Sequence, residues 1–174
     1  MRRTENAMND RDEEFGAFAR NCATPLHQTA YLLCGDWHLA HDLVQDTLVK
    51  AYQHWSRVRR ADSPDSYVRA ILLNEARSRW RRRERTVPVA RFPDGREPVT
   101  PDQTDEITSR AALLQALLAL PLRQRATVIL RYVEGMSERE TAAALGCSEG
   151  TVKSQSARAL GTLRTFLYRT ESTL

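Results

Sequence analysis

A proline-dense segment near the middle of the chain is the feature that most constrains its fold. Residues 86–106, TVPVARFPDGREPVTPDQTDE, hold four prolines, one glycine and five acidic residues against two arginines. Proline fixes φ and lacks the backbone N–H that a helix needs, so this segment favours an extended, semi-rigid backbone. Because strong helical patterns lie on both sides of it, we predict an acidic linker over 86–106 that joins two separate lobes.

The part of the chain before the linker predicts helices and contains no convincing strand pattern. Apolar residues recur with a period near 3.6 over 37–55, which indicates an amphipathic helix. Upstream we expect one helix over 13–22, and Thr24-Pro25 then begins or kinks a helix that continues to 33. These elements, with a further helix described below, predict a helical lobe over 11–85.

The part after the linker is also helical. Leucines over 113–120 form an apolar stripe, and Pro121 begins a helix that ends at Glu134-Gly135. Ser137, followed three residues later by Glu140, has the capping-box pattern of a helix start. We therefore predict a second lobe over 107–170 and an all-α fold of two small helical domains. Each lobe is small enough to need its full stripe of leucines and aromatics as core, and the sequence leaves open whether the two lobes touch.

A helix-turn-helix is predicted within residues 136–164. Three residues have the spacing that is typical of this motif. Ala142 is small and allows the helices to cross closely, Gly146 makes the turn four residues later, and Val152, ten residues after Ala142, packs between the helices. Ser148 can cap the second helix, whose apolar side we expect to comprise Val152, Leu160 and Leu163. This spacing favours DNA binding, with the second helix in the major groove. A helical hairpin with a purely structural role is the alternative.

The outer face of that second helix is unusual for a solvated surface. Its expected exposed residues are Lys153, Ser154, Gln155, Ser156 and Arg158, with no Glu–Lys pairs among them. Lysine, serine and arginine side chains suit base edges and phosphates, and the helix N-terminus at Thr151 favours phosphate oxygens. The predicted DNA contacts are Thr151, Lys153, Ser154, Gln155 and Arg158.

A second basic region precedes the linker. Residues 57–85 carry ten basic and four acidic side chains, a net charge of +6 in a chain whose total is +4. Ser63-Pro64 supplies the N-cap and first residue of a helix that ends in ARSRWRRRERT, with six arginines around Trp80. Such concentrated positive charge is typical of a nucleic-acid-binding surface. The alternatives are a solubilising charge run and, for Trp80, packing into the core rather than stacking on a base.

No catalytic constellation emerges, so we expect no enzymatic activity and no cofactor. The best metal candidates are Cys22, His27, Cys34, His38 and His41, but their spacing fits no zinc pattern and both cysteines fall on apolar stripes. We therefore expect no metal, with redox or zinc sensing as the alternative. No apolar run approaches the roughly 20 residues of a membrane span, and no signal peptide is recognisable, so a cytoplasmic protein without membrane insertion is expected.

Three motifs in order resemble the extracytoplasmic-function sigma factors, a two-domain class of bacterial transcription initiation factors. AYLLCGDWHLAHDLVQDTLVKAYQHW is similar to family region 2.1–2.2, and SYVRAILLNEARSRWRRR to region 2.3–2.4. LLALPLRQRATVILRYVEGMSERETAAALGCSEGTVKSQSARALGTLR is similar to region 4.1–4.2. The sequence YVRAILLNEARSRWRRR is similar to that of the SigE-like subgroup of this family.

The resemblance implies partners for each surface: core RNA polymerase, through its β′ coiled coil and β flap, and promoter DNA. The resemblance implies that Asp42, Gln45 and Asp46 dock on the β′ coiled coil. Without the resemblance, these residues are interpreted as ordinary solvated residues of an amphipathic helix. The −10 element and upstream backbone would be met by Asn74, Arg77, Trp80, Arg81 and Arg82, and the −35 element by the helix-turn-helix. The acidic linker would follow the polymerase's RNA exit path.

Some points stay open at the level of sequence. Gln155 occupies a place where the family commonly has arginine, and Ala157 is smaller than is frequent there, which leaves the promoter sequence undefined. The resemblance also leaves open whether an anti-sigma factor binds the chain. The alternative functions are a dimeric helix-turn-helix regulator and a metal-dependent nuclease.

Overall fold

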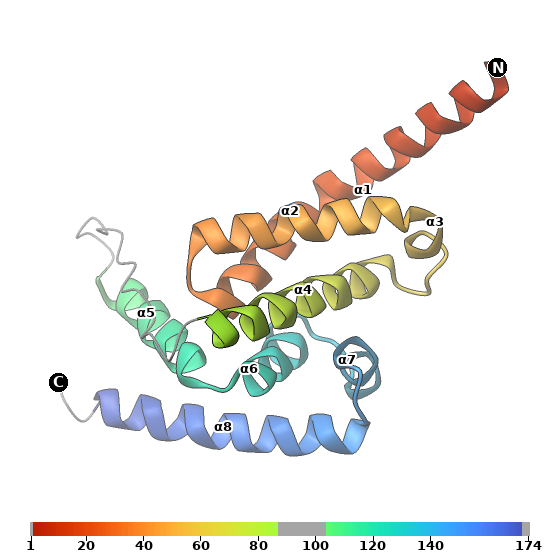
Figure 1. The fold of residues 1–174 in the computed structure, drawn as a ribbon. Helices are drawn as coiled ribbons and strands as arrows, with labels where there is room; N and C mark the ends of the chain where they lie inside the picture. Colours follow the sequence, from red (N-terminus) through yellow and green to blue (C-terminus); the bar gives the residue numbers. More distant parts are fainter. Residues whose placement is uncertain (1, 87–103, 172–174) are drawn as a thin grey trace.

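The computed structural model describes residues 2–86 and 104–171, and these residues form helices without a strand, as predicted. The elements are α1 (Arg2–Cys34), α2 (Trp37–Gln53), α3 (Trp55–Val58), α4 (Pro64–Thr86), α5 (Thr104–Ala119), α6 (Leu122–Val128), the π-helical turn η1 (Ile129–Val133), α7 (Glu138–Leu145) and α8 (Glu149–Glu171). Helices α1 to α4 form an N-terminal lobe and α5 to α8 a C-terminal lobe (Figure 1). Most of the predicted linker, 87–103, lies outside the described residues. None of the helices in the described ranges combines the length and hydrophobicity needed to span a bilayer.

The sequence predicts that Thr24-Pro25 either begins or kinks a helix, and the structure of α1 rules out a new start at that point. Helix α1 is a single helix with Pro25 in its interior. An interior proline costs about 3 kcal/mol because it removes one backbone donor. Cys22 before the proline and Leu26, Ala30 and Leu33 after it are all buried in the same core. Burial of one continuous stripe therefore outweighs the local preference for a break.

The turn between α1 and α2 brings the two lobes into close contact. Gly35 has φ +72°, a left-handed conformation that glycine adopts without steric cost. Asp36 then caps α2, its Oδ1 accepting a hydrogen bond of 3.0 Å from the Leu39 N–H. A Cβ at Gly35 would lie 2.6 Å from Cδ1 of Leu118 in α5. Glycine is required here both by the backbone and by the neighbouring lobe.

The C-terminal lobe has the helix ends that the sequence predicts. Ser137 and Glu140 form a complete capping box at α7, and Gly146 ends that helix with φ +62°. Ser148 caps the next helix, its Oγ accepting a bond of 3.2 Å from the Thr151 N–H. Hydrogen bonds with Ser137 lower the pKa of Glu140, so the capping carboxylate keeps its charge more readily than an ordinary one.

The sequence leaves open whether the two lobes touch, and in the structure they share a core. One buried cluster combines Leu33, Val44 and Leu72 of the N-terminal lobe with a set from the other lobe, namely Ala126, Ile129, Leu130, Met136 and Ala144. A smaller cluster joins α5, α6 and α8 through Leu117, Leu120, Val128, Ala159 and Leu163. Helices α6 and α7 lie between α4 and α8 (Figure 1). Apolar surface from both lobes is removed from water where they pack together, which favours this arrangement.

Candidate nucleic-acid interface

The helix-turn-helix has the predicted geometry at the point where its two helices meet. Ala142 is buried and Val152 is completely inaccessible, and Gly146 makes the left-handed turn between them. Leu160 departs from the prediction because it is 38% exposed, while Ala159 is fully buried. The inward stripe of α8 therefore passes through Ala159 instead of Leu160, and it includes Leu163 as predicted.

The outer face of α8 is narrower than predicted. Lys153, Ser154 and Arg158 are exposed, but Ser156 is only 8% exposed and Gln155 is half-buried. Ser156 lies four residues after Val152, so the helical repeat places both on the same inward stripe. The prediction of an exposed Ser156 is therefore wrong, and the free polar face consists of Lys153, Ser154 and Arg158.

Local contacts hold this face in place. The Lys153 ammonium lies 3.4 Å from Oε2 of Glu138, at the start of α7. The Ser154 hydroxyl donates a bond of 3.0 Å to the Thr151 carbonyl. The Lys153 side chain is two-thirds exposed, and an exposed pair of this kind is worth at most about 1 kcal/mol. A phosphate or a guanine edge could therefore displace Glu138 at little cost.

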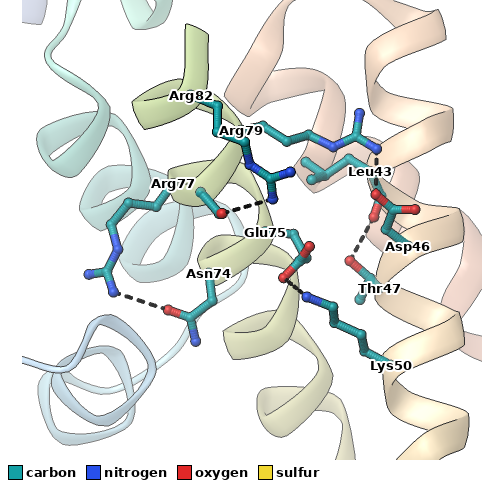
Figure 2. Close-up of polar contacts among 10 residues, drawn as sticks. Leu43, Asp46, Thr47, Lys50, Asn74, Glu75, Arg77, Arg79 and Arg82 are labelled. Carbon is teal, nitrogen blue, oxygen red and sulfur yellow. Dashed lines mark hydrogen bonds and ion pairs between the residues drawn. The ribbon is translucent and has the colours of Figure 1, made fainter. Parts of the chain in front are cut away.

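Helix α4 divides its polar residues between two sides, as Figure 2 shows. On the side of α2, Arg79 pairs with Asp46 at 2.5 Å and approaches Asp42 at 4.0 Å. Lys50 of α2 also pairs with the buried Glu75. The sequence pattern did not identify Arg79 as a partner of these acids, because the pairing spans 33 residues along the chain.

The other side of α4 holds Asn74 and Arg77 of the predicted −10 residues, whereas Arg82, seven residues after Glu75, lies on the side of Glu75 and Arg79. The Arg77 guanidinium donates a bond of 3.4 Å to Oδ1 of Asn74, and both side chains lie away from α2 (Figure 2). Arg81 and Arg82 are exposed, and Arg82 donates to the Ser78 hydroxyl at 3.2 Å. Trp80 is partly buried against the core. Its ring also borders a hollow beside three arginines, Arg77, Arg81 and Arg123.

The predicted docking residues share one exposed face of α2. Asp42, Gln45 and Asp46 lie at i, i+3 and i+4, a spacing that places side chains on the same side of a helix. The Asp42 and Asp46 side chains are 63% and 50% exposed. Buried Leu43, Val44 and Thr47 hold the opposite side of the helix in the core. The result is an accessible acidic surface with Arg79 at its edge.

The two predicted DNA-binding sets meet in one cleft between the lobes. Asn74 and Arg77 of α4 line it from one side, and Thr151 and Gln155 of α8 from the other. Its apolar lining comprises Leu73, Ala76, Leu122, Ala126, Ala144 and Leu145. In the described part of the chain, no hydrogen-bond partner reaches the buried Oε1 of Gln155. The structure thus separates Thr151 and Gln155, which face the cleft, from Lys153, Ser154 and Arg158, which face outward.

The cysteines and histidines form no metal site within residues 2–86 and 104–171. Cys22 and Cys34 are buried, free thiols, and burial raises the pKa of Cys22 to about 11. The pKa of Cys34 is raised for the same reason. His27 stacks on His41 with a ring nitrogen separation of 3.3 Å. Packing in the core is therefore a sufficient explanation for the presence of Cys22 and Cys34.

Two family models match the chain, one in each lobe. Residues 10–86 match "Sigma-70 region 2", and residues 110–163 match "Sigma-70, region 4". The RNA polymerase sigma-E factor of Streptomyces avermitilis is 39% identical over 152 residues, which cover 87% of this chain and 83% of that protein. The ECF RNA polymerase sigma factor SigM of Mycobacterium tuberculosis is 34% identical over 142 residues, covering 82% and 71% of the two chains.

Solved structures show the same fold. The sigma factor RpoE of Bartonella quintana, in complex with the anti-sigma factor NepR, is 29% identical with a TM-score of 0.77, covering 90% of this chain and 98% of RpoE. CnrH, in complex with the cytosolic domain of CnrY, is 25% identical with a TM-score of 0.62, covering 91% and 90%. Both matches extend across both lobes.

Proposed function

This chain belongs to the extracytoplasmic-function sigma factors. From that premise we propose which of its surfaces binds RNA polymerase and which bind promoter DNA. As a sigma factor, it binds core RNA polymerase and directs promoter-specific transcription initiation. We place it in the cytoplasm with the polymerase and assign it no catalytic activity of its own. The chemistry then belongs to the polymerase, and this chain supplies recognition and strand opening.

The acidic surface of α2 is the proposed docking site for the β′ coiled coil. Asp42, Gln45 and Asp46 project from a helix whose opposite face is locked in the core, so the surface is rigid before the partner arrives. A rigid, exposed set of carboxylates suits a basic partner surface and loses little side-chain entropy on binding. This surface is the observation that best supports a sigma factor, because a dimeric helix-turn-helix regulator would not need it.

The basic side of α4 is the proposed site for the −10 element and the duplex upstream of it. Arg81 and Arg82 are exposed and can neutralise phosphates. Trp80 and Asn74 offer a ring and an amide to unpaired bases. Arg79 takes no part in this assignment, because it is engaged with Asp46 and Asp42. The proposed N-terminal domain is 11–85.

The C-terminal lobe, 107–170, is the proposed reader of the −35 element and the proposed contact for the β flap. Lys153, Ser154 and Arg158 lie in the N-terminal half of α8, the part of a recognition helix that reaches base edges. Lysine can bond to guanine O6 and N7, and serine to several bases. Thr151 and Gln155 complete the set once α4 no longer covers them. An anti-sigma factor is a further proposed partner, since RpoE was solved in complex with the anti-sigma factor NepR.

The test is retention of purified bacterial core RNA polymerase by the immobilised protein. Asp46→Arg should abolish retention because it reverses the charge of one of the two carboxylates on the docking surface. Arg79→Gln is the matched control: it removes the same ion pair but leaves the Asp46 carboxylate in place, so retention should persist. Equal loss in both variants would mean that the ion pair, and not the carboxylate, matters. Absence of retention by the wild type would refute the proposed function.

A further inference from the structure

We propose that a hollow between α4 and α6 binds a nucleoside triphosphate, with its arginines on the phosphates and Trp80 on the base. Five residues line the hollow: Arg77, Trp80 and Arg81 of α4, and Leu122 and Arg123 of α6. Arg123 belongs to none of the surfaces proposed for DNA or polymerase. Promoter recognition therefore leaves part of this hollow unexplained.

The side chains of α4 reach the hollow because of their spacing along the helix. Arg77 and Arg81 lie at i and i+4, and Trp80 lies three residues after Arg77, so all three project from one side of α4. Arg77 lies away from α2 (Figure 2). From the other lobe, Leu122 packs against the core, and the next residue, Arg123, is exposed. Two helices thus supply three cations to one hollow.

The charge of the hollow favours an anion. Its five lining residues include no acid, and within the described ranges no carboxylate pairs with its three arginines. Cations four residues apart on one helix repel each other, and the guanidinium from α6 adds to that repulsion. A concave site with charges of one sign concentrates ions of the opposite sign. Guanidinium groups bind phosphate oxygens through paired hydrogen bonds, so a chain of phosphates suits all three.

Arg77 also has a hydrogen-bond donor that the protein does not use. Its Nε is buried, and no acceptor reaches it in the described part of the chain. A terminal nitrogen of the same guanidinium donates a long bond, of 3.4 Å, to Oδ1 of Asn74. A desolvated donor without an acceptor is unfavourable. A phosphate oxygen in the hollow would provide an acceptor after a small rotation of the side chain.

The size of the hollow and its aromatic ring favour a nucleotide over phosphate alone. Its volume is about 380 Å³, within the range of about 300–1,000 Å³ that is usual for small-molecule sites. Trp80 borders it, and an indole ring can stack on any base. The neighbouring cleft, which Thr151 and Gln155 line, has about 40 Å³, enough for a few water molecules but not for a base. The base is therefore assigned to Trp80.

The hollow shares Arg77, Trp80 and Arg81 with the surface proposed for the −10 element. A bound nucleotide and unpaired promoter bases would therefore compete for the same three side chains. Only this consequence rests on the proposed function, because nucleotide binding is measured on the free chain without polymerase or promoter.

The experiment is isothermal titration calorimetry of the full chain with ATP, inorganic triphosphate and adenosine, at fixed ionic strength without divalent cations. Arg123→Gln is compared with Arg164→Gln, which removes the same charge from an exposed residue of the same lobe that does not line the hollow. Arg123→Gln should weaken ATP binding about tenfold, because it removes a charge-assisted hydrogen bond, whereas Arg164→Gln should bind ATP as the wild type does. Equal ATP affinity of the two variants would overturn the proposal.

A further variant tests the base. The wild type should bind ATP about tenfold more tightly than inorganic triphosphate, because the base stacks on Trp80, and it should bind adenosine more weakly than either. Trp80→Leu should remove the difference between ATP and triphosphate but keep triphosphate binding, which also verifies that the hollow is still formed. If triphosphate binds the wild type as tightly as ATP, the nucleotide assignment is overturned. The proposed function fails on a different result, namely no retention of core polymerase by the wild type.

Discussion

Replacement of Arg125 by methionine tests how the two lobes are held together. Methionine has a similar length and is apolar, so it keeps most of the packing and removes the guanidinium. Three carbonyls, those of Leu33, Leu118 and Leu120, then lose their donor. The surroundings are shielded from water, so the carbonyls cannot be solvated without local opening.

The magnitude follows from two opposing effects. Each unsatisfied buried carbonyl costs about 1–3 kcal/mol, so three cost about 6 kcal/mol at the middle of that range. Burial lowers the pKa of Arg125 to about 10, and this desolvation penalty, about 3 kcal/mol at 1.36 kcal/mol per pKa unit, is relieved in the variant. The net expectation is a loss of about 3 kcal/mol, a large part of the 5–15 kcal/mol stability of an ordinary domain.

The assay is urea unfolding followed by far-ultraviolet circular dichroism at neutral pH. With a slope of about 1–3 kcal/mol per molar urea, the midpoint should fall by roughly 1–3 M. Arg123→Met is the matched control, because Arg123 lies on the same helix but is exposed, and its effect should stay within about 0.5 kcal/mol. If Arg125→Met is no more destabilising than this control, the carbonyl contacts do not hold the lobes together.

Two further predictions concern the reading helix and a buried thiol. Lys153→Ala combined with Arg158→Ala should reduce −35-dependent transcription in a reconstituted initiation assay yet leave core retention unchanged; loss of core retention instead would show that the surfaces are misassigned. The folded pKa of Cys22, about 11, exceeds the ordinary thiol value of 9.0, so stability present below pH 9 is lost as pH rises to about 11. Urea midpoints across this interval should fall less in Cys22→Ala, by up to about 3 kcal/mol in unfolding free energy, and an identical fall would rule out the buried thiol as the cause.

The Asp46–Arg79 pair changes how the docking surface is understood. Arg79 belongs to the arginine run that the sequence assigns to nucleic acid, yet it lies 2.5 Å from a carboxylate of the proposed polymerase surface. With both side chains a third to a half exposed, the pair is worth at most about 1 kcal/mol. Polymerase could therefore compete for Asp46 at little cost, and Arg79 would then be released beside the bound partner.

Local sequence determined the helices and the turns between them. The capping box at Ser137, the left-handed Gly146 and the inaccessible Val152 follow from residue type and spacing, because each depends on neighbours a few positions away. The motifs also determined the family, which the family models and relatives confirm. The proposed roles of Asp46, Lys153 and the other site residues remain predictions.

Tertiary structure alone decided the relation between the lobes. Pro25 lies inside α1 because residues on both sides of it are buried together. Ser156 is buried because α8 packs against its own lobe, whereas Gln155 is half-buried in the cleft that α4 also lines. The Arg125, Glu134 and Arg79 contacts join residues 92, 105 and 33 positions apart. The periodicity of a helix indicates which of its faces is apolar, but it does not indicate which other helix covers that face. That choice depends on the total surface that can be buried at once, and this quantity exists only when the whole chain is folded.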